Sequence, residues 1–412
     1  MEARPSKKGY YPFLDGLKGI TCASVFLGHY FIAFCVKDIF PVNSPVYRAG
    51  EFIFQGSFAV SLFCVISGFL AAHKSLNTIR EFLSCCIKRF LRFEIPLLIV
   101  IAGVMFLNGR GLFSCCEPLA DILENKRIQG QFVYKTNYLS LFQKPFWSFW
   151  QYDNPLWMIC QLFAGGIVIY MRSYVLTLFA RRLSAQQMKA IRILSFVVIA
   201  SCGIIDTTMF AVVLGGGLQE LSQKLSTLPA SKKTCIKSLS VLLAISALIA
   251  SIYLYFFKDF DYLHLGREYT WAGLAGALTC FCLLLSHARL KSFFSGKPFR
   301  LLGKISFGIY VLHYPLLGTV SCRLIYCFAN NLGYAKIVII AFALTSLSVL
   351  TAATAYRYLI ELPAYWLINR LPSGRQSPSQ SSAQSRDRDK PKIPDRREET
   401  ASETATTSSL GI

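Results

Sequence analysis

Ten mainly apolar stretches, separated by polar loops, constrain the fold of this 412-residue chain more than any other feature. In lipid the backbone must satisfy its own hydrogen bonds, and a helix that crosses a bilayer needs roughly 20 predominantly apolar residues. Hydrophobic residues make up 54% of the chain, which is too many for a soluble domain of this size. We therefore predict an all-α, polytopic transmembrane bundle of about ten spans. The stretches lie near 14–35, 52–73, 93–108, 156–171, 193–205, 207–222, 238–257, 269–287, 305–326 and 337–358.

The basic residues provide a second view of the topology. The formal net charge is +21, which in a soluble protein would suggest nucleic acid as a partner. Here the lysines and arginines gather in the loops after the second, fourth, sixth and eighth stretches. Loops with such a bias are usually cytoplasmic, so an even number of spans places both termini in the cytoplasm. We expect a multi-pass protein of the plasma membrane, surrounded by lipids and without a nucleic-acid partner.

Composition also divides the chain into three parts. Residues 1–12 are predicted to be a cytoplasmic flank, and residues 13–368 a single membrane domain. Beyond Leu371 the chain is rich in Ser, Thr and charged residues and has no aromatic residue. Such a segment has little to bury, so 369–412 is predicted to be a disordered cytoplasmic tail. The 14 cysteines show no zinc-ligand spacing, and no metal is expected.

Two ionisable side chains lie inside the first apolar stretch, FLDGLKGITCASVFLGHY. Lys18 and His29 are eleven residues apart, which on a helix is three turns plus roughly 20°, so they share one face about 16 Å apart. One interpretation is that Lys18 reaches to the membrane surface and His29 hydrogen-bonds within the bundle. The other is functional, because a deep imidazole is costly in lipid and is the usual proton carrier near neutral pH.

A pair of arginines begins the third stretch, in CIKRFLRFEIP. Arg89 and Arg92 are three residues apart, so on a helix both guanidinium groups point to the same side. Two adjacent guanidinium groups, each with a fork of N–H donors, suit the binding of a phosphate. Basic residues at a cytoplasmic helix end are also what membrane topology alone requires. The sequence leaves both interpretations open.

A polar face is also predicted in LLGKISFGIYVLHYPLL. Ser306, Tyr310 and His313 are spaced by four and three residues, which stacks them on one helix face. This face suits either a functional cavity or a structural network of hydrogen bonds between helices.

Six strings, taken in order, form a more specific pattern. They are YYPFLDGLKGITCASVFLGHY (10–30), SFAVSLFCVISGFL (57–70), KRFLRFEIP (88–96), NPLWMI (154–159), LGKISFGIYVLHYPLL (302–317) and IELPAYW (360–366). Together they resemble the integral-membrane acyltransferase 3 family. The matching features are a basic residue eleven positions before a histidine, Ser-Gly-Phe-Leu, Arg-x-x-Arg, Leu-Trp, a Ser/Tyr/His face and Glu-x-Pro. The resemblance covers nearly everything except the tail.

This resemblance implies an O-acyltransferase that moves an acyl group, most often acetyl, from cytoplasmic acyl-CoA to a hydroxyl of an extracytoplasmic acceptor. Acetyl-CoA is then the co-substrate, and a cell-surface carbohydrate or lipid-linked glycan is the acceptor. The residues implied in catalysis are His29, Ser306 and Tyr310, and those implied in binding acyl-CoA are Lys18, Arg89, Arg92, Trp157 and His313.

The sequence departs from the family pattern at one position. Many members carry a glutamate about five residues after the Leu-Trp tryptophan, where this chain has Leu162. A carboxylate partner for His29 at that position is therefore absent. This leaves an alternative open, a polytopic transporter or exporter that uses the same polar cavity without acyl transfer.

Overall fold

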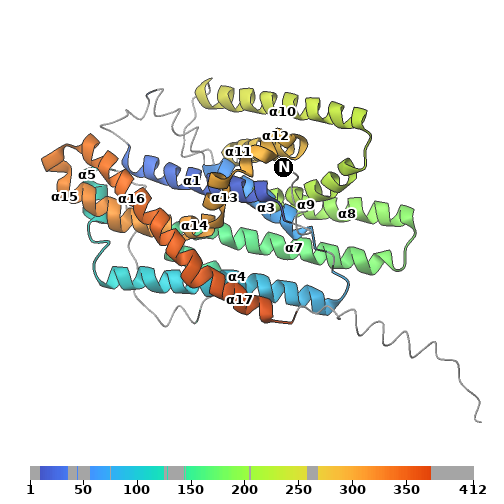
Figure 1. Ribbon diagram of the computed structural model, residues 1–412, viewed down its shortest axis with the longest axis horizontal. Helices are drawn as coiled ribbons and strands as arrows, with labels where there is room; N and C mark the ends of the chain where they lie inside the picture. The colour runs from blue at the N-terminus through green and yellow to red at the C-terminus, as the bar shows by residue number, and fades with distance from the viewer. Residues whose placement is uncertain are drawn as a thin grey trace, which may run out of the picture. The chain divides into compact units, whose positions relative to one another are not determined.

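The computed structural model describes residues 10–35, 44, 56–74, 76–124, 128, 143, 145–203, 206–257 and 268–372, and every regular element within them is helical (Figure 1). The α-helices are α1 (Pro12–Phe34), α3 (Gly56–Ala71), α4 (Ile79–Gly109), α5 (Cys116–Ile122), α7 (Trp157–Ala180), α8 (Ala185–Gly203), α9 (Thr207–Ser226), α10 (Ala230–Phe257), α11 (Glu268–Ser286), α12 (Ala288–Phe294), α13 (Lys297–Lys304), α14 (Ser306–Leu316), α15 (Cys322–Leu332), α16 (Tyr334–Tyr356) and α17 (Leu362–Arg370). Two 3-10 helices, η1 (Phe146–Gln151) and η2 (Asn154–Leu156), precede α7. Two π-helical turns, η3 (Leu317–Ser321) and η4 (Arg357–Glu361), interrupt the last two long helices.

The prediction of a helical membrane bundle is confirmed, and the prediction of ten spans is met only in part. Within the described ranges, five helices are long and apolar enough to cross a membrane. A sixth span results if α11 and α12, bent by 104° at their junction, count as one. The five are Pro12–Phe34, Ile79–Gly109, Asn154–Ala180, Ser306–Leu332 and Tyr334–Arg370.

The other predicted stretches form α3, α8, α9 and α10. They are helices, but α3 has only 16 residues, and α8 carries Lys189 and Arg192 within its first half. The cytoplasmic position of both termini stays a prediction. Residues 1–9 of the predicted flank and 373–412 of the predicted tail lie outside the described residues.

Glycines allow α3 and α9 to approach closely. A Cβ on Gly68 would lie 1.8 Å from the carbonyl oxygen of Val212, and one on Gly215 would lie 2.1 Å from that of Val65. Small residues at such positions let helix backbones touch, which is a main source of helix association in membranes. The two glycines therefore explain why α3, which is short, packs firmly in the bundle.

The first half of α1 is fixed against α13 in the same way. A Cβ on Gly19 would lie 2.5 Å from the backbone nitrogen of Gly303, and one on Gly303 would lie 1.9 Å from the carbonyl oxygen of Asp15. Further along α1, the Cys22 thiol contacts the carbonyl oxygen of Ser306 at 3.1 Å. These contacts set the position of α1 relative to α13 and α14.

Helix α4 begins at a capping sequence. The backbone N–H of Glu81 donates to the Thr78 side chain at 3.1 Å, and the Glu81 carboxylate accepts from the backbone N–H of Asn77 at 2.7 Å. Such reciprocal bonds satisfy N–H groups that a helix start leaves unpaired. They fix the start of the helix that carries Arg89 and Arg92, and α4 then runs beside α7 (Figure 1).

Candidate active site

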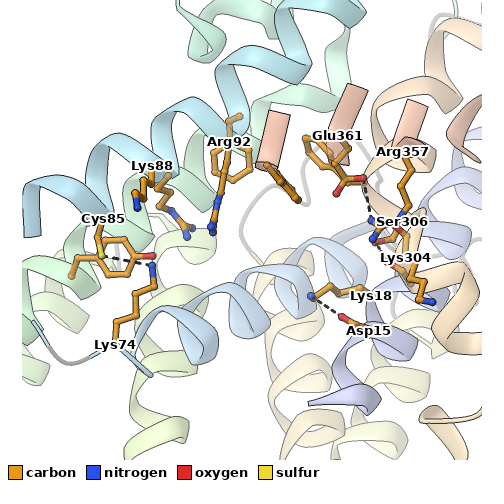
Figure 2. A pocket seen from close by; sticks show the side chains of 16 residues that line it. Asp15, Lys18, Lys74, Cys85, Lys88, Arg92, Lys304, Ser306, Arg357 and Glu361 are labelled. Atoms are coloured by element: carbon orange, nitrogen blue, oxygen red, sulfur yellow. Dashed lines mark hydrogen bonds and ion pairs between the residues drawn. The ribbon is translucent and has the colours of Figure 1, made fainter. Parts of the chain in front are cut away.

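A cavity of about 380 Å³ lies among the first halves of α1 and α4, the middle of α7, the end of α13 and the η4 turn (Figure 2). It is lined by Asp15, Lys18, Lys74, Cys85, Lys88, Arg89, Arg92, Phe93, Tyr170, Gly303, Lys304, Ser306, Phe307, Arg357, Glu361 and Tyr365. Seven of these side chains are cationic and two are acidic, which leaves a formal charge of +5. We call this cavity the basic pocket. Its charge suits a ligand with several phosphates.

Arg89 is held in the basic pocket by contacts from α3 and α7. Its Nη2 donates to the Ser67 hydroxyl at 2.9 Å and also to the carbonyl oxygen of Leu162. The guanidinium lies over the rings of Phe93 and Tyr170. Its Nε has no hydrogen-bond partner among the described residues. Arg89 is thus an ordered cation in the pocket lining, which suits the binding of an anion.

Arg92 and Lys18 also line the pocket, as the sequence predicts for a shared site. Arg92 donates from Nη2 to Oδ1 of Asn369 at 3.2 Å, and its guanidinium lies 5.6 Å from the centre of the Tyr365 ring. Lys18 pairs with Asp15 at 3.4 Å. In Figure 2, Lys88 and Arg92 come from one side of the cavity, and Lys18 comes from another.

The two predicted histidines meet in the interior of the bundle. Nδ1 of His29 lies 2.8 Å from Nε2 of His313, and the two ring planes are within 9° of parallel. His313 is completely buried, whereas part of the His29 surface stays accessible. The ring of Tyr314 meets His29 edge-on, with 5.6 Å between centroids. His29 is therefore the less buried member of the pair.

The hydrogen bonds define the proton positions of a neutral pair. Nδ1 of His313 contacts the carbonyl oxygens of Tyr310 at 2.7 Å and Ile309 at 3.1 Å. A carbonyl only accepts, so this nitrogen carries the proton and Nε2 of His313 must accept. Nδ1 of His29 then donates to it. The remaining nitrogen of His29, Nε2, carries a free lone pair, which is the form that a general base or a nucleophile needs.

The basic pocket and the histidine pair are linked by two helices. On α1, Lys18 of the pocket precedes His29 by eleven residues, or about 16 Å of helix. On α14, Ser306 of the pocket precedes His313 by seven residues, or about 10 Å. A ligand anchored by its charges in the pocket must therefore extend over roughly 10–16 Å to place a reacting group at His29.

The remaining predicted site residues lie in different places. Ser306 lines the pocket, and its hydroxyl donates to the carbonyl oxygen of Gly303 at 2.8 Å. The Tyr310 hydroxyl donates to the carbonyl oxygen of Pro155. Trp157, in the first turn of α7, is 42% exposed and is not part of the pocket lining. His313 does not line the pocket either. Its hydrogen-bond partner is His29, which lies outside the pocket lining.

The structure also places in the basic pocket five residues that the sequence analysis did not assign to a site. Lys74, Lys88, Lys304, Arg357 and Glu361 all line the basic pocket. The sequence analysis noted Glu361 only as part of the Glu-x-Pro pattern and assigned it no function. The four cations looked like ordinary basic loop or helix-end residues, because their partners come from distant parts of the chain.

Asp153 is a further buried acid, next to the polar face of α14. It is 1% exposed, and neither carboxylate oxygen has a hydrogen-bond partner in the described structure. Burial raises the pKa of the Asp153 carboxyl well above its ordinary value. Asp153 lies close enough to Tyr310 and Tyr314 to interact with both. A carboxyl therefore exists near this face although position 162 is a leucine.

The described residues contain no group of three or more His, Cys, Asp or Glu side chains arranged to hold a metal ion. The chemistry that the site residues themselves offer is anion binding in the pocket and proton transfer or nucleophilic attack at His29.

Comparison with known proteins identifies the family of the chain. The family model for the acyltransferase domain of the acyltransferase 3 family matches residues 11–357. Comparison with curated proteins and with solved structures gives no match. The matched range extends from the residue before α1 to the first residue of η4, so it includes both histidines and most of the basic pocket. The chain therefore belongs to the acyltransferase 3 family of membrane acyltransferases.

Proposed function

We propose that this protein is an acyl-CoA-dependent O-acyltransferase that transfers an acyl group, acetyl in the first instance, to a hydroxyl of an extracytoplasmic acceptor. One observation carries the proposal. A histidine with a free Nε2 lone pair lies about 10–16 Å from a strongly basic pocket, on helices that belong to both sites.

The basic pocket is proposed to hold the charged part of acyl-CoA. The phosphates of CoA match an excess of five positive charges, and the pocket supplies both forked guanidinium groups and flexible ammonium groups. The narrow, flexible arm of CoA then extends along α1 and α14 toward His29. This arrangement uses Lys18, Arg89 and Arg92 as the sequence predicts.

Proton transfer at His29 gives a balanced reaction. Nε2 of His29 takes the proton of the acceptor hydroxyl while the hydroxyl oxygen attacks the thioester carbonyl carbon. The tetrahedral intermediate collapses, the carbon–sulfur bond breaks, and the CoA thiolate takes the proton back from His29. His313 accepts the hydrogen bond from Nδ1 throughout, which keeps Nε2 unprotonated at the start and stabilises the imidazolium that forms.

A second route uses the same nitrogen. Nε2 of His29 attacks the thioester and CoA leaves as the thiolate. The acyl-imidazolium then transfers its acyl group to the acceptor hydroxyl, whose proton passes to the CoA thiolate. A quench during turnover with labelled acetyl-CoA separates the two routes, because only this one leaves label on the peptide that contains His29.

The acceptor is proposed to be a cell-surface carbohydrate or a glycolipid of the plasma membrane. The support is the family membership, since members commonly modify such hydroxyls.

The test is transfer of label from acetyl-CoA by the purified protein in nanodiscs, with the polar glycolipid fraction of the expressing cells as acceptor. We expect CoA release that depends on the extract, and its loss in His29→Ala. Binding of acetyl-CoA without transfer to any extract would contradict the enzymatic proposal and favour a transporter.

A further inference from the structure

Glu361 is a buried carboxylate on the wall of the basic pocket. Its side chain is 5% exposed, and Arg357 lies 3.3 Å from its Oε2. The Tyr365 hydroxyl also interacts with it. Figure 2 shows Glu361 beside Arg357, facing the cavity that Arg92 enters from the other side. None of the steps proposed above uses this acid.

The backbone explains how Glu361 comes to face the pocket. Residues Arg357–Glu361 form the π-helical turn η4, which inserts an extra residue into the helix. Pro363 follows two residues later and has no N–H to donate to the preceding turn, so a regular helix would be strained there. A wider turn relieves that strain, and π-turns often mark functional positions. The Glu-x-Pro pattern thus sets the direction of the Glu361 side chain.

The charge of Glu361 is unexpected in a site for phosphates. A carboxylate in the wall repels a polyanion, and it can only accept hydrogen bonds. Asp15, the other acid of the pocket, is paired with Lys18. A carboxylate at this position favours a ligand only if that ligand presents an O–H or N–H group next to its phosphates.

We propose that Glu361 accepts a hydrogen bond from an uncharged donor group of CoA, so that the pocket selects a nucleotide-linked thiol carrier over a bare polyphosphate. The inference rests on the proposed acyl-CoA donor. Two parts of CoA present such groups: the nucleoside, through ribose hydroxyls and the adenine amine, and the pantetheine arm, through its amides and hydroxyl.

The test compares two probes on the full-length protein in nanodiscs, by isothermal titration calorimetry. The first probe is CoA and the second is pyrophosphate, which carries charge but none of the ribose hydroxyl, amine or amide donors of CoA. In Glu361→Ala we expect CoA to bind about tenfold or more weakly, since a hydrogen bond to a charged group is lost. We expect pyrophosphate to bind more tightly, because a repelling charge is removed.

Two fragments identify the group that Glu361 contacts. Adenosine 3′,5′-bisphosphate carries the nucleoside, and 4′-phosphopantetheine carries the arm. The fragment that loses affinity in Glu361→Ala contains the hydrogen-bond donor. Glu361→Gln keeps an acceptor oxygen without the charge, so its CoA affinity should lie between those of the native protein and Glu361→Ala.

The matched control is Glu220→Ala. Glu220 forms an ion pair with Arg172 outside the basic pocket, so this variant also breaks an Arg–Glu pair but leaves the pocket lining intact. CoA affinity should not change. Size-exclusion profiles of all variants report whether they remain folded.

Opposite shifts for CoA and pyrophosphate support the inference. Tighter binding of both probes would overturn it, because Glu361 would then be only a counter-ion of Arg357. Weaker binding of both would also overturn it, because the carboxylate would then maintain the shape of the pocket without distinguishing CoA from pyrophosphate. If the native protein binds pyrophosphate but not CoA, the proposed donor itself is wrong, and this inference fails with it.

Discussion

A Cβ on Gly166 would lie 2.2 Å from Cζ of Arg89. The guanidinium of Arg89 occupies the space that any side chain at position 166 would need. Its hydrogen bonds to Ser67 and to the Leu162 carbonyl depend on that space. A glycine of α7 thus shapes the basic pocket through Arg89, although it does not line the pocket and offers no functional group.

Gly166→Ala should weaken acyl-CoA binding about tenfold or more, because the displaced guanidinium loses its position in the pocket. Titration calorimetry with acetyl-CoA measures the effect. Gly103→Ala is the control, since a Cβ there meets no atom within 4 Å. An unchanged dissociation constant in Gly166→Ala would show that Arg89 does not bind the donor.

His29→Ala should lower acyl transfer about 10²- to 10⁴-fold, the usual contribution of a general base, with little change in acetyl-CoA affinity. Release of CoA from acetyl-CoA in the presence of the glycolipid extract measures the rate. Full activity in this variant would remove His29 from the mechanism.

His313→Leu should also lower the transfer rate, because His29 then loses the acceptor that keeps its proton on Nδ1. His313→Gln offers an amide oxygen as acceptor and should restore part of the rate. Equal rates for the Leu and Gln variants would indicate that His313 only fills space.

Asp153→Asn should stabilise the protein at neutral and alkaline pH but not in acid. Because burial raises the folded-state pKa of Asp153 above that of the unfolded chain, the unfolded state binds fewer protons between these two values. The free energy of unfolding of the native protein therefore falls as pH rises above about 4, by ~1.4 kcal/mol for each unit between the two pKa values.

The measurement for Asp153 is the thermal midpoint in detergent, followed by tryptophan fluorescence from pH 4 to pH 8. The difference between Asp153→Asn and the native protein should grow with pH. A difference that stays constant over this range would mean that the carboxyl is ionised in the folded protein.

Gly68→Val should destabilise the bundle by about 1–3 kcal/mol or more, because its Cβ would overlap the Val212 carbonyl oxygen on α9. The thermal midpoint and the folded fraction in size-exclusion chromatography should both fall. Gly109→Ala, where a Cβ meets nothing within 4 Å, should leave both unchanged.

Helical periodicity accounts for the parts of the site that were predictable from the sequence. Arg89 and Arg92 share one face of α4 and both line the pocket, and Lys18 joins them from α1. The pairing of His29 with His313 was not predictable, because the two residues are 284 positions apart and only tertiary packing brings them together.

Single residues without a periodic signal escaped the sequence analysis. Asp153 precedes the Leu-Trp string as an isolated acid, and its burial depends on how η2 packs against α14. The count of ten spans stays a prediction, because some of the apolar stretches form helices that are short or carry charges, such as α3 and α8, and within the described residues five or six helices qualify as spans.

Lys18 and His29 are carried by one uninterrupted helix of 23 residues. The distance between them is consequently that of a rigid rod, set by backbone hydrogen bonds and not by loops that could stretch. In the proposed function, a substrate anchored at Lys18 would therefore deliver its far end to a constant depth along α1. A ligand with a flexible arm a few bonds shorter would fall short of His29, because the helix does not bend to close the gap. The site would therefore select its ligands by length as well as by charge.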